Sequence, residues 1–259
     1  MTKAGSIFLA VLWVIAAAGA EPALFDQLRI RMKRDPARVL AELRAQPALL
    51  RQKDATGQTL LHLAAQVGDR PLIEFLVESG LAVDAASPVG VTPLTQACLG
   101  QNVETATALL ELGADPNGKG SESPLHLVAG CGRGLCSPPR GQEGAWLALA
   151  RLLLDRGARV NARATNDWTP MHYAAEANNP AMVELLARRG GAVDARDGDG
   201  NTPLHLAVSR VCPLSVEALL KVGCRPGLRN QAGETALDLA RRRGLSPRIL
   251  RLLSAPPHP

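Results

Sequence analysis

Apolar residues fall into pairs of short runs along most of the chain, and each pair ends at a glycine. In the segment from Thr59 to Gly80, one apolar run follows Thr59 directly and a second, residues 72–77 (LIEFLV), comes about ten residues later. The spacing within the second run is that of one helical face. Gly80 stands where a helix C-terminal cap is expected. The pattern therefore predicts two short helices in each such segment.

A common hexamer marks the start of the first helix in six segments. The hexamers are Thr59–Ala64 (TLLHLA), Thr92–Ala97 (TPLTQA), Ser123–Val128 (SPLHLV), Thr169–Ala174 (TPMHYA), Thr202–Ala207 (TPLHLA) and Thr235–Ala240 (TALDLA), spaced 33, 31, 46, 33 and 33 residues apart. A Thr or Ser hydroxyl caps a helix N-terminus, and proline fits the first helical position because its missing N–H is not needed there. Short stretches rich in Asp and Gly, such as residues 192–201, predict β-turn fingers between the helix pairs.

This pattern resembles the ankyrin repeat, and six copies in register make the resemblance specific. It implies an all-α fold, an α-solenoid of helix-turn-helix repeats with β-turn fingers and capping repeats at both ends. We expect the N-terminal capping helix pair at residues 21–53, repeats 1–5 at 54–230 and the C-terminal capping repeat at 231–254. Repeat 3 carries a loop insertion at about residues 130–145, and Pro247 is expected to shorten the last helix.

The first 20 residues have the layout of a cleavable secretory signal. Lys3 precedes an apolar run at residues 7–18, and the small residues Ala18, Gly19 and Ala20 follow. The run of 12 is shorter than the roughly 20 residues that a membrane span needs. We expect cleavage after Ala20 and a protein in the periplasm or secreted. The tail at residues 255–259 (APPHP) is expected to be disordered.

Composition narrows the classes of function. The chain of 259 residues has 29 Lys and Arg against 24 Asp and Glu, and only 3% aromatic residues. The mostly interspersed charge argues against a dedicated nucleic-acid binder. The alternative is binding of nucleic acid or an anionic surface through the basic C-terminal cap, at residues 241–243, Arg248 and Arg251.

No motif for catalysis, a cofactor or a small-molecule substrate is found. The chain lacks a G-x-S-x-G elbow, a phosphate-binding G-x-x-x-x-G-K loop and a His-Glu-x-x-His motif. Four histidines, His62, His126, His172 and His205, hold one hexamer position. Equivalent positions in stacked helices lie roughly 8 to 10 Å apart, which is too far to share a metal. We expect these side chains to form hydrogen bonds between a turn and the neighbouring repeat.

The five cysteines allow one expected disulfide. Cys131 and Cys136 lie five residues apart in the insertion, and an oxidising compartment favours their pairing. Cys98 is expected to be a buried apolar residue. Cys212 and Cys224 flank one predicted helix and are too far apart to pair.

The resemblance also implies a function and a surface. Ankyrin-like proteins bind other proteins through finger tips and first helices, so we expect a monomeric, non-enzymatic scaffold whose partner is another protein. The positions carried over are Thr165, Asn166, Trp168, Asp199 and Asn201 on fingers, Gln66, Val67, Glu176 and Arg210 on first helices, and the apolar strip Val89, Val91 and Leu99. Trp168 is the expected anchor, because Trp is enriched among interface hot spots. Its alternative role is packing on the neighbouring finger. Protection against a toxin or support of a periplasmic enzyme is the specific function we expect.

Overall fold

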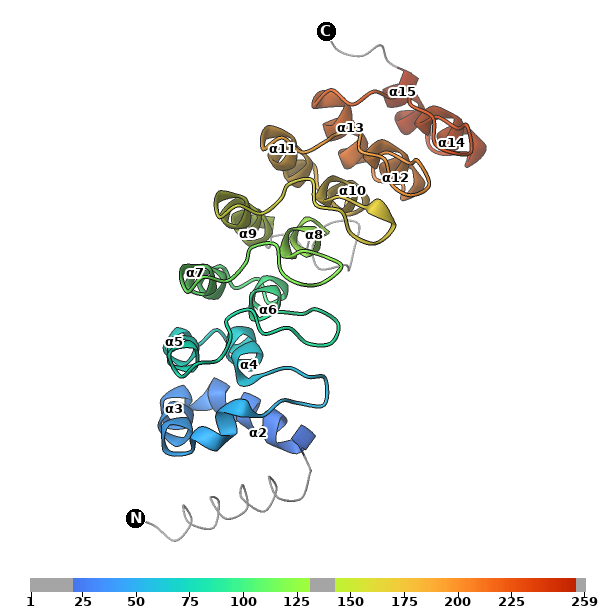
Figure 1. Ribbon diagram of the computed structural model, residues 1–259. Coiled ribbons are helices and arrows are strands. Elements are labelled where there is room, and N and C mark those ends of the chain that lie inside the picture. Colours follow the sequence, from blue (N-terminus) through green and yellow to red (C-terminus); the bar gives the residue numbers. More distant parts are fainter. Residues whose placement is uncertain (1–20, 131–142, 255–259) are drawn as a thin grey trace. The chain divides into compact units, whose positions relative to one another are not determined.

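Each hexamer opens a short helix in the computed structural model, which describes residues 21–130 and 143–254 (Figure 1). The expected signal at 1–20, the tail at 255–259 and the expected disulfide between Cys131 and Cys136 lie outside the described residues. The chain divides into two compact units, an N-terminal unit up to Gly120 and a C-terminal unit from Ser121 onward. Each unit is a stack of helix pairs.

The N-terminal unit begins with α2 (Glu21–Arg34), α3 (Pro36–Ala45) and the 3-10 turn η1 (Pro47–Arg51). Two helix pairs follow, α4 (Leu60–Val67) with α5 (Arg70–Glu78) and α6 (Pro93–Leu99) with α7 (Val103–Glu111). The first helix α4 packs on both α2 and α6, and α5 packs on α3 and α7. First helices thus form one layer and second helices the other, with Leu60, Leu76 and Leu94 completely buried between them.

The C-terminal unit repeats this arrangement. Its first helices are α8 (Pro124–Ala129), α10 (Pro170–Glu176), α12 (Pro203–Ser209) and α14 (Ala236–Arg242), and its second helices are α9 (Glu143–Asp155), α11 (Pro180–Arg188), α13 (Pro213–Lys221) and α15 (Pro247–Ser254). Each first helix packs on the next first helix, and each second helix on the next second helix. The 3-10 turn η2 (Thr165–Asp167) lies in the finger before α10. Among the described residues, the fingers contain one isolated antiparallel bridge, between Lys53 and Thr59, and no strand.

The helix ends follow from the local chemistry of the sequence. Thr92 caps α6 by accepting a hydrogen bond from Thr95 N, and Pro93 takes the first helical position. After the second helix, Gly80 and its equivalents adopt the left-handed conformation, with φ of +83 to +91°. That conformation favours glycine because a Cβ atom is disfavoured there.

Two details concern the first and last segments. Pro247 is the first residue of α15, which begins one residue later in its repeat than α5, α7, α11 and α13 do, as expected for a shortened last helix. Ile30, which continues the apolar pattern of the first segment, is 53% exposed, whereas its neighbours Leu28 and Met32 are buried. Ile30 lies on the face of α2 that points away from Leu28 and Met32, because residues two apart in a helix do not share a face.

Candidate functional site

The hexamer histidines connect neighbouring repeats, as the sequence predicts. Nδ1 of His62 accepts a hydrogen bond from the backbone N–H of Thr59 at 3.1 Å, so the proton of the neutral ring is on Nε2. Nε2 then donates to the carbonyl oxygen of Val91 in the next finger at 3.0 Å. His126, His172 and His205 donate in the same way to Ala162, Asn201 and Glu234. Burial lowers the pKa of all four rings. These side chains therefore hold each finger to the preceding helix.

Trp168 lies in an aromatic cluster at the base of its finger. Its ring packs edge-on against Tyr173 with centroids 5.3 Å apart and stacks on His172 at 6.2 Å. Tyr173 in turn meets His126 at 5.2 Å and donates a hydrogen bond to Glu122 at 2.7 Å. The indole is half-buried, so one part packs and the other remains accessible. Both roles considered for Trp168, packing and surface contact, are compatible with this position.

The finger that carries Trp168 has an unusual backbone. Asn166 and Asp167 both have positive φ, 57° and 58°. The equivalent of Asp167 is a glycine in four other fingers, at Gly57, Gly90, Gly200 and Gly233. Asn and Asp tolerate the left-handed conformation better than other residues with a side chain, but at a cost. Strained backbone of this kind often lies at functional sites.

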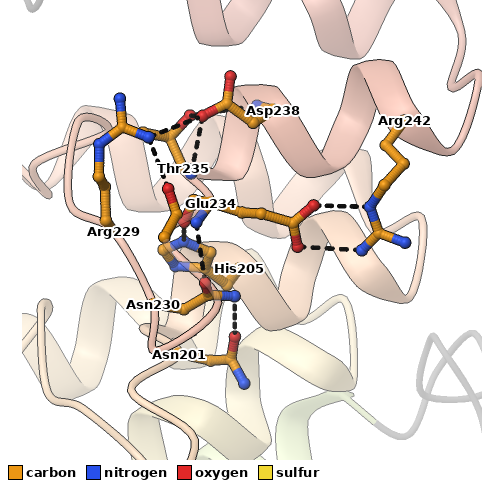
Figure 2. Close-up of polar contacts among 9 residues, drawn as sticks. Asn201, His205, Arg229, Asn230, Glu234, Thr235, Asp238 and Arg242 are labelled. Carbon is orange, nitrogen blue, oxygen red and sulfur yellow. Dashed lines mark hydrogen bonds and ion pairs between the residues drawn. The ribbon is translucent and has the colours of Figure 1, made fainter.

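Three of the predicted contact residues also hold the fingers together. Asn166 donates from Nδ2 to Asp199 at 3.3 Å, and its carbonyl accepts from Gly198 N at 2.9 Å. Figure 2 shows the next connection, where Asn230 Nδ2 donates to Asn201 Oδ1 at 2.9 Å. Sequence reasoning missed this role, because it depends on which groups face each other when fingers stack. Asn166, Asp199 and Asn201 fix the finger geometry, whereas Thr165 is exposed at the tip.

The two predicted positions at the ends of α10 and α12 contact each other. Glu176 is half-buried and forms an ion pair with the exposed Arg210 at 2.7 Å. Both lie in the same unit as Trp168. A partner that approaches these helices therefore meets a paired charge rather than an isolated one.

In the N-terminal unit, the predicted apolar strip is exposed to different degrees. Val89 is 78% exposed at the finger tip and Leu99 is 40% exposed at the end of α6, whereas Val91 is half-buried. At the end of α4, Gln66 is exposed and Val67 is half-buried. The structure thus leaves both Val89 and Leu99 open to contact.

Gln66 also borders a cavity of about 180 Å³ that the sequence did not predict. Phe25 and Leu63 provide apolar walls, and Gln58 and Gln96 are joined across it by a hydrogen bond of 3.0 Å. The cavity forms because α2 faces the first finger. Periodicity of one segment does not reveal such a juxtaposition.

The basic C-terminal cap is partly tied into the stack. Figure 2 shows Arg242 paired with both carboxylate oxygens of Glu234, the shorter distance being 2.6 Å. Arg248 pairs with Glu217 at 2.5 Å, and Arg243 donates to the carbonyl of Ser209. Asp238 takes the histidine position of the last hexamer, and hydrogen bonds from Thr235 lower its pKa. These arginines therefore have a structural role in addition to their charge.

The described cysteines form no disulfide. Cys98, Cys212 and Cys224 are buried, as expected for Cys98, and Cys212 and Cys224 are not bonded to each other, as expected. Burial raises the pKa of Cys98 and of Cys224 to about 12, so neither is a reactive thiolate at neutral pH. In the described ranges 21–130 and 143–254, no group of three His, Cys, Asp or Glu side chains could hold a metal ion. No described helix is long and apolar enough to cross a membrane.

Known proteins share both the sequence and the fold. The chain is 35% identical over 120 residues to "Ankyrin repeat, SAM and basic leucine zipper domain-containing protein 1" of Dasypus novemcinctus, and 34% identical over 137 residues to the protein of the same name of Neofelis nebulosa. These matches cover 46% and 53% of this chain but only 24% and 26% of the relatives. The chain therefore corresponds to about a quarter of the length of these relatives.

Solved structures match over more of the chain. The ankyrin repeat domain of Bcl-3 covers 88% of this chain with a TM-score of 0.69 and 26% identity, over 97% of its own length. An ankyrin repeat domain from Acinetobacter baumannii AYE covers 75% with a TM-score of 0.64 and 29% identity, over 95% of its own length. The sequence family described as "Ankyrin repeats (3 copies)" matches residues 30–120 and 142–230, more than half of the chain. The chain belongs to the ankyrin repeat family.

Proposed function

We propose that this chain is an exported, non-enzymatic scaffold that binds a partner protein through the surface around Trp168. Ankyrin repeats are typically protein-binding scaffolds, which supports the general class of function. The observation that carries the specific proposal is a half-buried tryptophan held by two aromatic rings beside an exposed finger tip.

The surroundings of Trp168 suit a binding anchor. Its ring is fixed by Tyr173 and His172, so little side-chain freedom remains to be lost on binding. The exposed tip residues Thr165 and Asp167 lie next to it in the chain. A rigid aromatic residue beside exposed polar groups resembles the centre and rim of known interfaces.

A second contact is proposed in the N-terminal unit. Of the expected strip Val89, Val91 and Leu99, Val89 and Leu99 are exposed, and exposed apolar side chains supply contact area for a partner protein. The cavity beside Gln66 adds a polar recess to this unit. For the partner, we propose a protein outside the cytoplasm, either a toxin that the scaffold inhibits or an enzyme that it supports. The layout of residues 1–20 supports this location.

The test is affinity capture from an envelope fraction with the tagged full-length chain. Wild type should retain a specific protein, and Trp168→Ala and Leu99→Asp should each lose most of it. Ile30→Asp is the matched control for Leu99→Asp, because Ile30 is an exposed apolar residue of the N-terminal unit outside the proposed strip.

Trp168→Ala also removes packing against Tyr173, so a second variant is needed. Thr165→Glu alters only the exposed tip and should weaken capture while leaving the melting temperature unchanged. Retention of every captured protein by Thr165→Glu, Trp168→Ala and Leu99→Asp together overturns the choice of surface. The location is tested separately by mass spectrometry, which should find Glu21 at the N-terminus of the exported protein.

A further inference from the structure

The turn between the two helices of each repeat requires a left-handed residue. Gly68, Gln101, Asn178, Val211 and Gly244 hold equivalent positions, and their φ angles lie between +52 and +88°. Glycine, asparagine and glutamine occupy four of the five. Val211, with φ of 58°, is the exception. A β-branched residue is a genuine outlier in this conformation, and the strain costs about 1 to 2 kcal/mol.

Burial does not explain the valine. The Val211 side chain is 51% exposed, so it gains only part of the free energy that a core position gives. Leu214, three residues later in the first turn of α13, is 42% exposed. The two residues lie only three positions apart in the chain, so both exposed side chains belong to the surface of the same turn. The other repeats place Pro71, Glu104, Ala181 and Pro247 at the position of Leu214. The pair is therefore an apolar patch that the repeat pattern does not require.

Positive charge surrounds this patch. Arg210 precedes Val211 directly, is 58% exposed and forms an ion pair with Glu176 at 2.7 Å, and Arg243 reaches back to the carbonyl of Ser209. Arg248 pairs with Glu217, which lies one turn after Leu214 in α13. Each guanidinium has five N–H donors, so one ion pair leaves donors for a further acceptor. Residues 203–254 carry nine Lys and Arg against three Asp and Glu, and three of the nine pair with Glu176, Glu184 and Asp194 outside this range, so a net positive charge remains.

We propose that Val211 and Leu214, with Arg210, Arg243 and Arg248 around them, bind an acidic amphipathic segment of a protein. Such a segment carries an apolar side chain for the patch and flanking carboxylates for the arginines. Strained residues persist where function retains them, which accounts for a valine at a position suited to glycine or asparagine. This surface consists of the turn between α12 and α13 and the neighbouring α14 and α15. It is distinct from the finger that carries Trp168, and the proposal does not depend on the proposed function.

An acidic protein segment fits the patch better than nucleic acid or a membrane. Single-stranded nucleic acid is bound by stacking on aromatic side chains, and helices α12 to α15 contain no Trp, Tyr or Phe. A membrane surface is bound by a continuous apolar helix face. In α15 the two buried residues Ile249 and Leu253 already pack into the stack. A small apolar patch within a positive rim suits one apolar residue between carboxylates.

The experiment is an NMR titration of the ¹⁵N-labelled full-length chain with a synthetic peptide of alternating Glu and Leu. Shift changes should centre on Val211, Leu214 and the neighbouring arginines. Two control peptides separate the contributions, one with Ser in place of Leu and one with Gln in place of Glu. Both should bind about tenfold more weakly, the size expected when a central contact is lost.

Variants give the second arm. Val211→Asn keeps the backbone conformation and removes the apolar side chain, so it should fold and bind the Glu-Leu peptide about tenfold more weakly. Leu214→Ala should do the same. Arg156→Gln, at an exposed position directly after α9 in the same unit, is the control and should bind as wild type does.

Three results overturn the proposal. The first is an absence of shift changes at Val211 and Leu214 when the Glu-Leu peptide is added. The second is binding of the Ser-substituted peptide as tight as that of the Glu-Leu peptide, which would show that charge alone determines binding. The third is binding of vesicles of phosphatidylglycerol or of a single-stranded oligonucleotide at this patch in preference to the peptide.

Discussion

Replacement of Val211 by asparagine should make the protein more stable. The left-handed backbone at Val211 costs about 1 to 2 kcal/mol for a β-branched side chain, and asparagine relieves most of this strain. Asn178 shows how asparagine fits the equivalent turn, since its Oδ1 accepts a hydrogen bond from Ser215 N of the next repeat at 3.1 Å. The amide oxygen of the asparagine introduced at position 211 is placed to accept the same bond from the backbone N–H of Arg248, 33 residues after Ser215.

The loss of apolar burial opposes this gain. Full burial of a valine is worth at least about 1.5 kcal/mol, and Val211 is 51% exposed, so its removal costs roughly 0.7 kcal/mol. The net stabilisation is then roughly 0.3 to 1.3 kcal/mol. For a chain of this size, that difference raises the melting temperature by about 1 to 5 °C.

The assay is thermal and urea unfolding followed by circular dichroism, on wild type and variants at equal concentration. Val222→Asn is the matched control, because Val222 has an ordinary negative φ of −84° and substitution relieves no strain there. It should leave stability unchanged or lower it. A Val211→Asn variant no more stable than wild type would refute the assignment of strain to this turn.

Three further predictions concern the histidines, the glycines and the thiols. Burial lowers the pKa of His62, His126, His172 and His205 below 6.5, so each ring takes up a proton on unfolding when the pH lies between its folded pKa and about 6.5. The free energy of unfolding should therefore have its full value above pH 6.5 and fall as the pH drops toward the folded pKa values, by up to about 1.4 kcal/mol per pH unit for each ring. Urea unfolding midpoints at pH 7.5 and 5.5 measure this change. Equal midpoints at the two pH values would contradict it. Gly90→Ala should cost about 2 kcal/mol or more in urea unfolding, because its φ is +80° and a Cβ would lie 2.4 Å from Gly120 Cα. Gly233→Ala has a similar φ but nothing within 4 Å, and should cost only about 1 kcal/mol; equal losses would show that contact with Gly120 is unimportant. Cys98 and Cys224, with pKa values of about 12, should resist Ellman's reagent at pH 8 in the native protein and react in urea, as peptide mapping can show; rapid native labelling of either would be inconsistent with its burial.

Local chemistry made most of the fold predictable. Thr92 caps the helix that Pro93 begins. Gly80 favours the left-handed conformation found after a second helix, because it lacks a Cβ atom. Neither depends on distant residues, so the sequence alone places these helix ends. The histidine bonds were predictable for a related reason, since one position recurs at the repeat period and faces the same neighbour each time.

The candidate site was only partly predictable. Trp168 stands out by residue type, but its packing on Tyr173 and His172 depends on the stack. Asn166 and Asp199 look like free finger-tip groups in the sequence, yet stacking directs them toward each other. Val211 had a signal that comparison of repeats could have found, because Gly68 and Gly244 share its register. The N-terminal cavity had no signal in the sequence, because it depends on how α2 packs beside the first finger.

Hydrogen–deuterium exchange of the full-length chain, with and without the protein captured from the envelope, tests the central claim most directly. The proposed scaffold function predicts slower exchange across residues 164–177, the finger and helix that carry Trp168, when the partner is bound. Protection confined to the outer helices α11 and α13, with residues 164–177 exchanging at the same rate in both states, would contradict it.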